Sequence, residues 1–438
     1  MSDLATRADR APALPRAAPA LLGYAAVRAL GLAVLAGWSA AHGRNAHTLL
    51  TARWDSLWYA RVAGLGYGYE VRLPDGAVHS DLAFFPLLPW LERLGAAVTP
   101  LGYGDVGLAV SLLASLAAAW GIFAVADHLY GRRAGVCATL LWAVLPVAVV
   151  QSMAYSESLF TALAAWALYA ALTGRWVTAG ALALAAGLTR PVGLAVTAAV
   201  WTAGAVSFAR ERRAARERSA VRDQLAAREW PAAQEQSAAT SSGCTGSPAP
   251  TGGVREVVRA PARTTAPPRG GAPARRRALG MLLAPLGCAG YLLWVGHRTG
   301  RGLWGYARVQ AGWRNGFDGG RAFARFTAEK FTSLPSAPAG LGLVAGVALV
   351  VWLYVTCVRQ RQPLELLVYA GVVTALALGA SGYFGSKPRL LLPAFPLLLP
   401  LALALARRPV RRSALVLGAV AVLSAVYGAV WLNGTGPP

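Results

Sequence analysis

Long apolar segments recur along the whole chain of 438 residues, and short polar segments separate them. A helix needs about 20 mostly apolar residues to cross the hydrocarbon core of a bilayer. The pattern therefore predicts an all-α polytopic membrane protein with about eleven transmembrane helices. We place these predicted spans at 20–41, 105–126, 134–151, 156–173, 176–190, 191–209, 278–297, 337–357, 363–381, 389–406 and 413–432.

One pair of neighbouring spans is ambiguous. The region 176–209 is interrupted by Thr189-Arg190-Pro191, and a proline breaks a helix because it lacks a backbone donor and clashes with the preceding turn. The pattern fits one long broken helix, two short spans or a re-entrant pair.

The same pattern divides the chain into four regions. A cytoplasmic N-terminus (1–19) precedes an N-terminal membrane module (20–209), which includes an extracytoplasmic loop (42–104). A linker (210–277) and a C-terminal membrane module (278–438) follow. The linker opens with a charged helical run and then becomes rich in Pro, Gly and Ser. We expect disorder there, because such a composition buries too little apolar surface to fold.

Composition and charge support a membrane protein and give its orientation. Charged residues make up 14% of the chain, against roughly 25% in soluble domains. The net charge is +23, but the basic residues lie at the ends of spans and in the linker. The positive-inside rule explains them without a nucleic-acid partner, and it places 210–277 in the cytoplasm and 42–104 outside. The Arg-rich and Ala-rich composition is typical of a bacterial protein, so we expect a bacterial plasma membrane.

A later polar region, 298–336, opposes the charge rule. It would lie outside the cell, yet it carries seven basic residues and two acidic ones. Either this region contacts an anionic partner, or late loops obey the rule poorly. The sequence leaves both explanations open.

The sequence does not favour a metal or a cofactor. The four cysteines are scattered, and their spacing fits neither a metal site nor a disulfide framework. No Gly-rich nucleotide-binding motif is present. We therefore expect neither.

The external loop 42–104 carries the leading candidate for chemistry. Its pattern predicts two amphipathic helices, 53–65 and 87–97, at the membrane interface. Asp55 lies between Trp54 and Trp58 in the first of them. A partly desolvated carboxylate suits a general base, because desolvation favours its accepting a proton. The alternative is an interfacial or helix-capping acid without a catalytic role.

Other polar residues have both a functional and a structural interpretation. Asp81 either binds substrate or caps the following helix. His79 either donates a hydrogen bond to a substrate hydroxyl or is a solvent-exposed loop histidine. Glu157, at the outer end of a span, is either a site residue or a favourable acid at a helix N-terminus. Arg190 needs an anionic partner, either a lipid headgroup or Glu157. Lys387 and Arg389 either bind phosphate or reach the interface as cations at a span end.

Several of these motifs resemble a known family. RWDS (53–56), AFFP (83–86) and AYSESLF (154–160) resemble the PIG-V-type mannosyltransferases, membrane glycosyltransferases of the GT-C fold related to GPI mannosyltransferase 2. In the C-terminal half, KPRL (387–390) and PAFP (393–396) match only a generic GT-C pattern. The Arg-rich linker is not part of the family pattern.

The resemblance implies a GT-C-like fold and a mannosyltransferase that uses a polyprenyl-phosphate donor and inverts the sugar carbon on the extracytoplasmic face. It places Asp55 at the position of the catalytic acid. The acceptor remains open among a glycan, a glycolipid and a protein. The expected substrate-binding residues are Arg53, Trp54, His79, Asp81, Phe84, Phe85, Tyr155 and Glu157, and the residues expected to bind the donor phosphate are Arg190, Lys387 and Arg389.

Two other function classes fit parts of the pattern. A transporter or flippase of a lipid-linked sugar would use the same arginines but would not need an interfacial Asp between aromatic residues. A non-catalytic membrane scaffold would not depend on Asp55.

The predicted orientation can be tested by cysteine labelling. We expect an Ala77→Cys variant to react with a membrane-impermeant thiol reagent in intact cells, because charge asymmetry places 42–104 outside. Labelling only after lysis would contradict the orientation.

Overall fold

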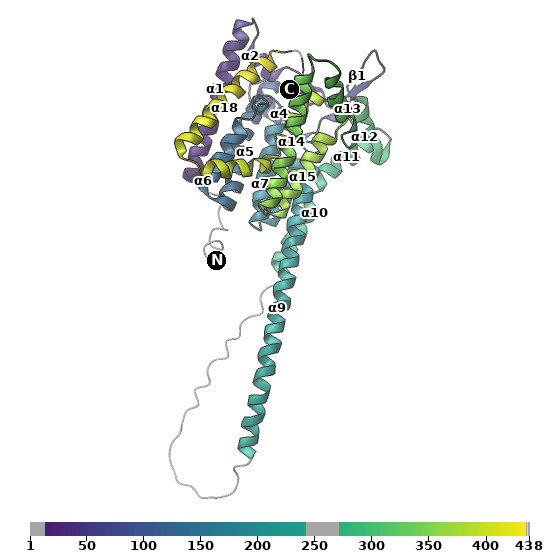
Figure 1. The fold of residues 1–438 in the computed structure, drawn as a ribbon. Helices are drawn as coiled ribbons and strands as arrows, with labels where there is room; N and C mark the ends of the chain where they lie inside the picture. The colour runs from purple at the N-terminus through teal and green to yellow at the C-terminus, as the bar shows by residue number, and fades with distance from the viewer. Residues whose placement is uncertain (1–13, 242–270, 435, 437–438) are drawn as a thin grey trace. The chain divides into compact units, whose positions relative to one another are not determined.

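The structure is a computed structural model that describes residues 14–241, 271–434 and 436. The chain forms two compact units, one of 1–203 with 276–438 and one of 204–275. The first unit holds the helix bundle and every site discussed below. The elements (Figure 1; η denotes a 3₁₀ helix) are α1 (Leu14–Ala41), α2 (Ala46–Thr51), α3 (Asp55–Leu65), β1 (Glu70–Arg72), β2 (Val78–Ser80), η1 (Asp81–Ala83), α4 (Leu87–Val98), α5 (Tyr103–Tyr130), α6 (Arg132–Ala143), η2 (Ala148–Ser152), α7 (Glu157–Leu172), α8 (Trp176–Gly187), α9 (Gly193–Ser241), α10 (Gly271–Leu283), α11 (Leu286–Arg298), η3 (Gly302–Trp304), α12 (Gly305–Gly312), α13 (Arg321–Glu329), η4 (Lys330–Thr332), α14 (Ala337–Arg359), α15 (Leu364–Gly379), η5 (Phe384–Ser386), α16 (Lys387–Leu390), η6 (Phe395–Leu398), α17 (Leu399–Ala406) and α18 (Val410–Leu432).

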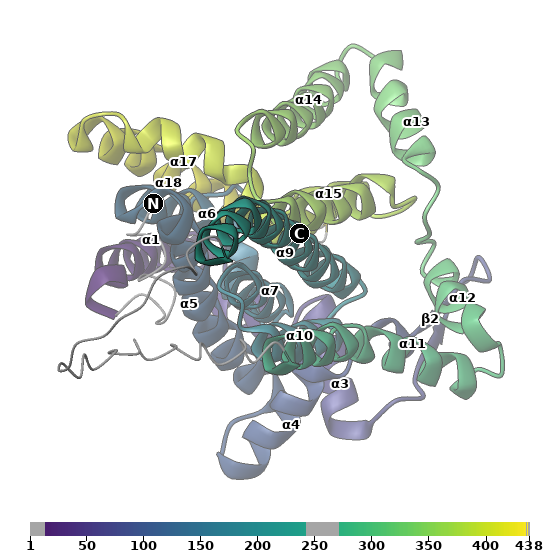
Figure 2. The ribbon, with the colours of Figure 1, turned by 90° about the horizontal axis from the view of Figure 1, so that it is seen from below.

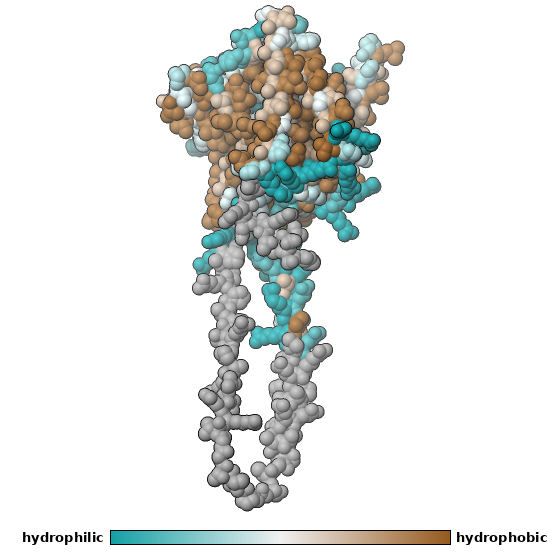
Figure 3. All heavy atoms as spheres, turned by 90° about the vertical axis from the view of Figure 1, so that its left-hand side faces the viewer, coloured by the Kyte–Doolittle hydropathy of each residue, from teal (hydrophilic) through white to brown (hydrophobic). Residues whose placement is uncertain are grey.

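The protein is an all-α multi-pass membrane protein with fewer full spans than the sequence predicted. Within the described residues, six helices are long and apolar enough to cross a membrane, or seven if the bent segment that combines 384–390 with 395–406 is one span. Hydrophobic side chains cover most of the face of the bundle seen in Figure 3, as lipid-facing helices require. Three further predicted spans coincide with shorter apolar helices, α7, α8 and α15. At 16 residues, α7 is only about 24 Å long, and most of its side chains are buried.

The predicted span 134–151 is not continuous. α6 ends at Ala143, and a 3₁₀ helix follows after Pro146. Proline cannot continue the helical hydrogen bonds, so carbonyl groups are left free at this break. The guanidinium of Arg28 on α1 donates to the carbonyl of Ala143 at 2.5 Å and to that of Ala148. A buried arginine thus satisfies the broken helix end.

Two more predicted spans contain breaks. The ambiguous region 176–209 forms two helices, α8 and α9, separated by residues 188–192. The carbonyl of Leu188 in this break accepts a hydrogen bond from the backbone N–H of Leu87 at 3.0 Å. The predicted span 389–406 is bent by 77° between α16 and the η6–α17 segment, which contains several prolines. Both breaks lie beside the cavity described below.

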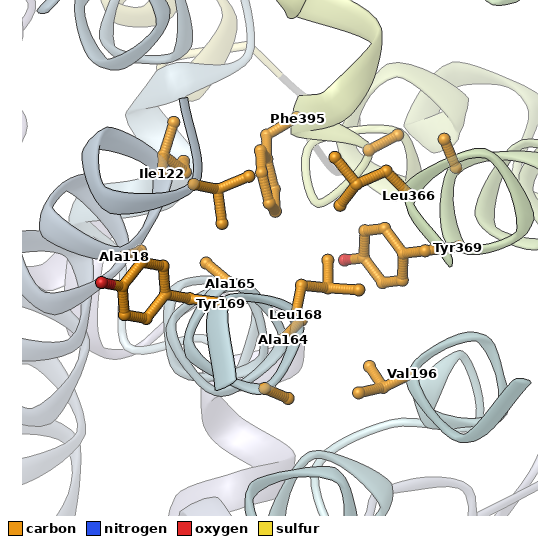
Figure 4. Close-up of a cluster of buried hydrophobic side chains, with 14 of the residues drawn as sticks. Ala118, Ile122, Ala164, Ala165, Leu168, Tyr169, Val196, Leu366, Tyr369 and Phe395 are labelled. Carbon is orange, nitrogen blue, oxygen red and sulfur yellow. The ribbon is translucent and has the colours of Figure 1, made fainter. Parts of the chain in front are cut away.

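α7 lies at the centre of the largest buried cluster. Gly121 of α5 lets the two helices approach closely, since an added Cβ there would lie 2.9 Å from the Cβ of Ala165 on α7. Small residues serve this purpose between membrane helices. Figure 4 shows helices from both halves of the sequence meeting around α7, with Ala118, Ile122, Ala164, Ala165, Leu168, Tyr169, Val196, Leu366, Tyr369 and Phe395 labelled.

The two helices predicted in the first loop, 53–65 and 87–97, are confirmed as α3 and α4. Between them lies an antiparallel hairpin, β1–β2, that the sequence analysis did not predict. The dipeptide Asp75-Gly76 in its turn is a typical hairpin signal. Figure 2 shows α11 and α12 beside this hairpin. The indole of Trp313, just after α12, donates to the carbonyl of Ser80 at 2.9 Å, so the later half of the chain holds the first loop in place.

The predicted linker is partly helical where it is described. α9 continues through the charged run to Ser241, and α10 begins at Gly271. Residues 271–277, for which the sequence predicted disorder, therefore begin a helix, in a run of Ala and Arg that favours helix formation. The remaining stretch predicted to be disordered, 242–270, lies outside the described residues, as does most of the predicted N-terminal segment 1–19.

Glu92 is an unusual buried group outside the spans. It lies fully buried between α4 and α5, against Gly107, and neither carboxyl oxygen has a hydrogen-bond partner among the described residues. Burial raises the pKa of Glu92 from 4.5 to about 9. The carboxyl is therefore protonated in the folded protein at neutral pH.

This raised pKa makes stability depend on pH. Between about pH 4.5 and about pH 9 the unfolded chain loses a proton that the folded chain keeps, so the free energy of unfolding falls as pH rises. Glu92→Gln removes this ionisation. We expect its melting temperature, relative to the parental protein, to rise steadily across this pH range in detergent. Exposed Glu70 is the control, because Glu70→Gln should show no such trend. A difference for Glu92→Gln that is constant with pH would contradict the assignment.

Candidate active site

A cavity of about 450 Å³ lies where the first loop meets the later half of the chain. Its wall comes from α3, the η1–α4 turn, the α8–α9 break, α12 with the chain after it, α15 and α16. The apolar part of the wall includes Phe84 and Phe85, two of the residues expected to bind substrate. The polar side chains of the wall are Asp55, Tyr59, Glu157, Thr189, Arg190, Tyr306, Gln310, Asn315, Tyr383, Ser386 and Arg389.

Four charged side chains form a network in this wall. Arg389 donates to Oδ2 of Asp55 at 2.7 Å, and its Nε lies 3.0 Å from Oε1 of Glu157. Arg190 forms an ion pair with the same oxygen of Glu157. The structure therefore gives Arg190 the partner that its position requires. The two carboxylates and the two guanidiniums have formal charges that sum to zero.

The members of this network differ in exposure. The side chain of Glu157 is 1% exposed, whereas that of Asp55 is 26% exposed. Charges at the depth of Glu157 must be paired, because an unpaired buried charge is strongly destabilising. Asp55 keeps part of its surface open while it is paired with Arg389. Of the two acids, only Asp55 is in a position to exchange its partner readily.

Breaks between helices bring the four charges together. Asp55 and Glu157 are the first residues of α3 and α7, where the helix dipole favours negative charge. Arg190 lies in the α8–α9 break and Arg389 in the four-residue α16. Trp54 begins α3 with a positive φ of 51°, a rare conformation for a bulky residue. A strained turn thus sets the position of Asp55.

An aromatic wall faces these charges. The rings of Trp58 and Phe84 are stacked with centroids 5.6 Å apart. Tyr59 and Trp313 contact Phe84 edge to face at 5.1 Å and 5.5 Å. Since Tyr59, Phe84 and Trp313 line the cavity, it has a charged side and an aromatic side.

A chain of hydrogen bonds ends at an unpaired acceptor in the cavity wall. The hydroxyl of Tyr306 donates to the carbonyl of Ala83 at 3.3 Å, and Gln310 donates to that hydroxyl at 2.7 Å. Asn315 donates to the amide oxygen of Gln310 at 3.0 Å. Tyr306, Gln310 and Asn315 thus each donate one hydrogen bond in this chain. Among the described residues, Oδ1 of Asn315 has no hydrogen-bond partner. These bonds fix the side chains of Gln310 and Asn315 in the cavity wall.

Arg53 and Trp54, expected to bind substrate, do not line the cavity. The guanidinium of Arg53 donates to the carbonyls of Leu432 and Gly434 at 2.5 Å and 2.6 Å, and it lies over the ring of Trp54 at 3.9 Å. These contacts tie the first loop to the end of α18. In this structure both residues support the position of Asp55.

His79 and Asp81 also lie outside the cavity wall. His79 stacks on the ring of Trp313 with centroids 4.1 Å apart. Asp81 accepts hydrogen bonds from the backbone N–H groups of Gly68 and Tyr69. Burial raises the pKa of Asp81 above its usual value, although these hydrogen bonds oppose the shift. Both side chains shape the loop that holds the aromatic wall.

Lys387 and Tyr155 occupy a layer behind the cavity. The amine of Lys387 donates to the carbonyls of Ala377 and Ala380 at 2.9 Å and 2.7 Å, so it caps the end of α15. The buried ring of Tyr155 lies 5.1 Å from the guanidinium of Arg389. Both residues fix elements that carry the charged network.

Sequence reasoning identified Phe84 and Phe85 but missed the aromatic and amide residues that 298–336 contributes to the site. It singled out the region 298–336 for its positive charge, yet the lining residues from this region include Gln310, Trp313 and Asn315 and none of its basic residues. Isolated amides and aromatic residues carry no local signal, because the fold alone brings them opposite Asp55. Within the described residues, no three His, Cys, Asp or Glu side chains are placed to hold a metal.

An apolar groove of about 1130 Å³ adjoins the cavity. It lies between α13, α14 and α15, and Phe317 lines both hollows. Gly379 lets the ring of Phe317 lie against α15, since an added Cβ there would collide with the ring. The groove is lined mainly by aliphatic and aromatic residues, including Phe323, Phe331, Val344, Val347, Val351, Trp352 and Val355. A cavity with a charged network in its wall thus lies beside a groove suited to a hydrocarbon chain.

The chain has a limited likeness to known proteins. No protein-family model matches the sequence, and no curated protein matches it. Among solved structures, the fold is similar to the crystal structure of ArnT from Cupriavidus metallidurans bound to undecaprenyl phosphate, with a TM-score of 0.47 and 17% sequence identity. The match covers 90% of this chain and 63% of that one, so the chain spans less than two thirds of the length of ArnT. A likeness of this degree does not assign a substrate.

The unequal burial of the two carboxylates leads to a prediction about stability. We expect Glu157→Gln to lower the free energy of unfolding by about 3–5 kcal/mol, because it leaves two buried guanidiniums without their shared anion. Asp55→Asn should change it by about 1 kcal/mol or less, because Asp55 is partly exposed and Arg389 keeps Glu157. Thermal unfolding of both variants in detergent compares the two. Equal melting temperatures would contradict the central role of Glu157.

Proposed function

We propose that this protein is an integral-membrane glycosyltransferase that moves a sugar from a polyprenyl-phosphate donor to an acceptor hydroxyl. The observation that carries the proposal is the carboxylate of Asp55, which lines a cavity, remains partly exposed and faces the guanidinium of Arg389. A carboxylate and a phosphate-binding cation within one cavity are the two groups that this transfer requires.

In the proposed reaction, Asp55 acts as the base and the arginines bind the phosphate. Asp55 takes the proton of the acceptor hydroxyl as its oxygen attacks the anomeric carbon. The bond from that carbon to the donor phosphate breaks, and the polyprenyl phosphate leaves with the electron pair. Arg389, with Arg190 behind it, stabilises the negative charge on the leaving phosphate. Attack opposite the leaving group inverts the sugar carbon.

The rest of the cavity suits the sugar. Aromatic rings such as Phe84 and Trp313 pack against the C–H face of a sugar ring, and the polar side chains of Gln310 and Asn315 line the same cavity. The apolar groove beside the cavity, joined to it at Phe317, would hold the hydrocarbon chain of the donor. An acceptor reaches Asp55 from its exposed side.

The finer assignment rests on the sequence motifs. The resemblance of 53–56, 83–86 and 154–160 to PIG-V-type enzymes favours mannose as the sugar and the GT-C fold. The distribution of arginine favours the extracytoplasmic face of a bacterial plasma membrane. The acceptor is a glycan, a glycolipid or a protein with a free hydroxyl.

The proposed base has a direct test. Asp55→Asn keeps the size and most hydrogen bonding of the side chain but cannot take the proton. We expect sugar transfer to fall by about 10²–10⁴-fold, the usual contribution of a general base. The assay follows radiolabelled mannose from polyprenyl-phosphate mannose into a membrane extract.

Two results would redirect this proposal. Transfer near the parental rate in Asp55→Asn, with loss in Glu157→Gln, would place the base elsewhere in the cavity. A parental protein that moves lipid-linked sugar across vesicles without transferring it would identify a flippase, which has no need for a base.

A further inference from the structure

Arg389 holds two carboxylates of different character. Its Nε faces Glu157, which is buried and is also paired with Arg190. Its NH2 group donates to Asp55, which lines the cavity and is partly exposed. The contact with Glu157 uses Nε, whereas the contact with Asp55 uses the terminal nitrogen Nη2.

This arrangement raises a conflict within the proposed mechanism. A carboxylate oxygen that is held by a guanidinium is not free to accept the proton of a hydroxyl group. A guanidinium that is already neutralised is also a weaker binder of phosphate. In the structure, Asp55 occupies the guanidinium that would bind the phosphate, and Arg389 occupies the carboxylate that would take the proton.

We infer that the phosphate of the donor displaces Asp55 from Arg389, so that binding of the donor frees the base. This inference rests on the proposed function and adds the order of events at its site. The phosphate takes the NH2 group of Arg389, while Glu157 and Arg190 keep the guanidinium oriented. Asp55, released at the N-terminal end of α3, then faces the acceptor.

Three observations support displacement at this contact. The charges of the network already sum to zero, so an incoming phosphate is better accommodated in exchange for a carboxylate than in addition to it. Asp55 holds Arg389 by one oxygen at 2.7 Å, and within the described residues it forms no other ion pair. Its exposure of 26% lets water replace the guanidinium on its carboxylate. Glu157, by contrast, is also paired with Arg190, and its side chain is only 1% exposed.

The consequence is an ordered reaction. Before the donor binds, the base is held by Arg389 and cannot activate a hydroxyl or a water molecule. After the donor binds, the same guanidinium stabilises the leaving phosphate and Asp55 is available. Asp55 is therefore available as a base only when a phosphate occupies Arg389.

The inference makes a counterintuitive prediction about affinity. If Asp55 competes with phosphate, its neutralisation should tighten binding of a phosphate ligand even as transfer is lost. We expect Asp55→Asn to bind farnesyl phosphate about fivefold more tightly than the parental protein, the value for loss of a partly exposed ion pair of about 1 kcal/mol. Isothermal titration of the purified protein in detergent measures the affinity.

Matched controls separate the phosphate from the hydrocarbon chain and the cavity from the surface. Farnesol, which lacks the phosphate, should bind Asp55→Asn and the parental protein equally. Asp75 is also paired with an arginine, Arg314, but outside the cavity, so Asp75→Asn should leave the affinity for farnesyl phosphate unchanged. Asp55→Glu keeps the competing charge and should show no tightening. Asp55→Ala serves as a second neutral variant should Asp55→Asn fail to fold.

The outcomes distinguish this inference from the proposed function. Equal or weaker binding of farnesyl phosphate by the folded neutral variants, with a parental protein that prefers farnesyl phosphate to farnesol, would overturn the displacement and leave the transferase intact. A parental protein that does not distinguish farnesyl phosphate from farnesol would overturn the displacement together with the proposed donor.

Discussion

The site depends on the ion pairs that the carboxylate of Glu157 forms with two arginines. This carboxylate is almost fully buried and lies between the guanidiniums of Arg190 and Arg389. These three residues belong to α7, to the α8–α9 break and to α16, so one anion joins the N-terminal half of the bundle to the C-terminal half. In an apolar interior an ion pair contributes little net stability when intact, but removal of one partner is strongly destabilising. The network therefore specifies the arrangement of these elements more than it stabilises the fold.

The broken helices follow from the same constraint. A continuous membrane helix satisfies its own backbone, and its side chains point outward at regular spacing. To direct two arginines at one carboxylate, the chain interrupts its helices beside Pro191 and Pro388 and satisfies the freed backbone groups by other means. Leu188 accepts from the backbone of the first loop, and Lys387 binds the carbonyls at the end of α15. Non-helical backbone at this depth is tolerated because protein surrounds it.

The sequence predicted those parts of the structure that local patterns determine. The apolar segments gave the helical class, and the aromatic and amphipathic pattern gave the helices now seen as α3 and α4. Local pattern does not distinguish a helix that faces lipid from one buried in the bundle, so α7 and α15 were counted as full spans. Nor does it show which partner an ionisable side chain finds. Lys387 and Arg389 are two residues apart and were given one role, yet one caps a helix and the other lines the cavity. Trp313 and Asn315 reach the site only because α12 packs on a hairpin more than 200 residues earlier in the chain, as their contacts with Ser80 and with the Tyr306 chain show.

A cavity of zero net charge is a suitable resting state for a site within a membrane. Two uncompensated arginines beside hydrocarbon would bind any anionic lipid headgroup, because charge at low dielectric is not screened by salt. Two uncompensated carboxylates would take up protons instead, as Glu92 does where it lies without a partner. Pairing them keeps both kinds of group ionised and leaves one contact, between Asp55 and Arg389, where an anion with a better fit to the guanidinium can enter. Because Glu157 is buried, it keeps the two arginines in place. Because Asp55 is partly exposed, a substrate can displace it from Arg389.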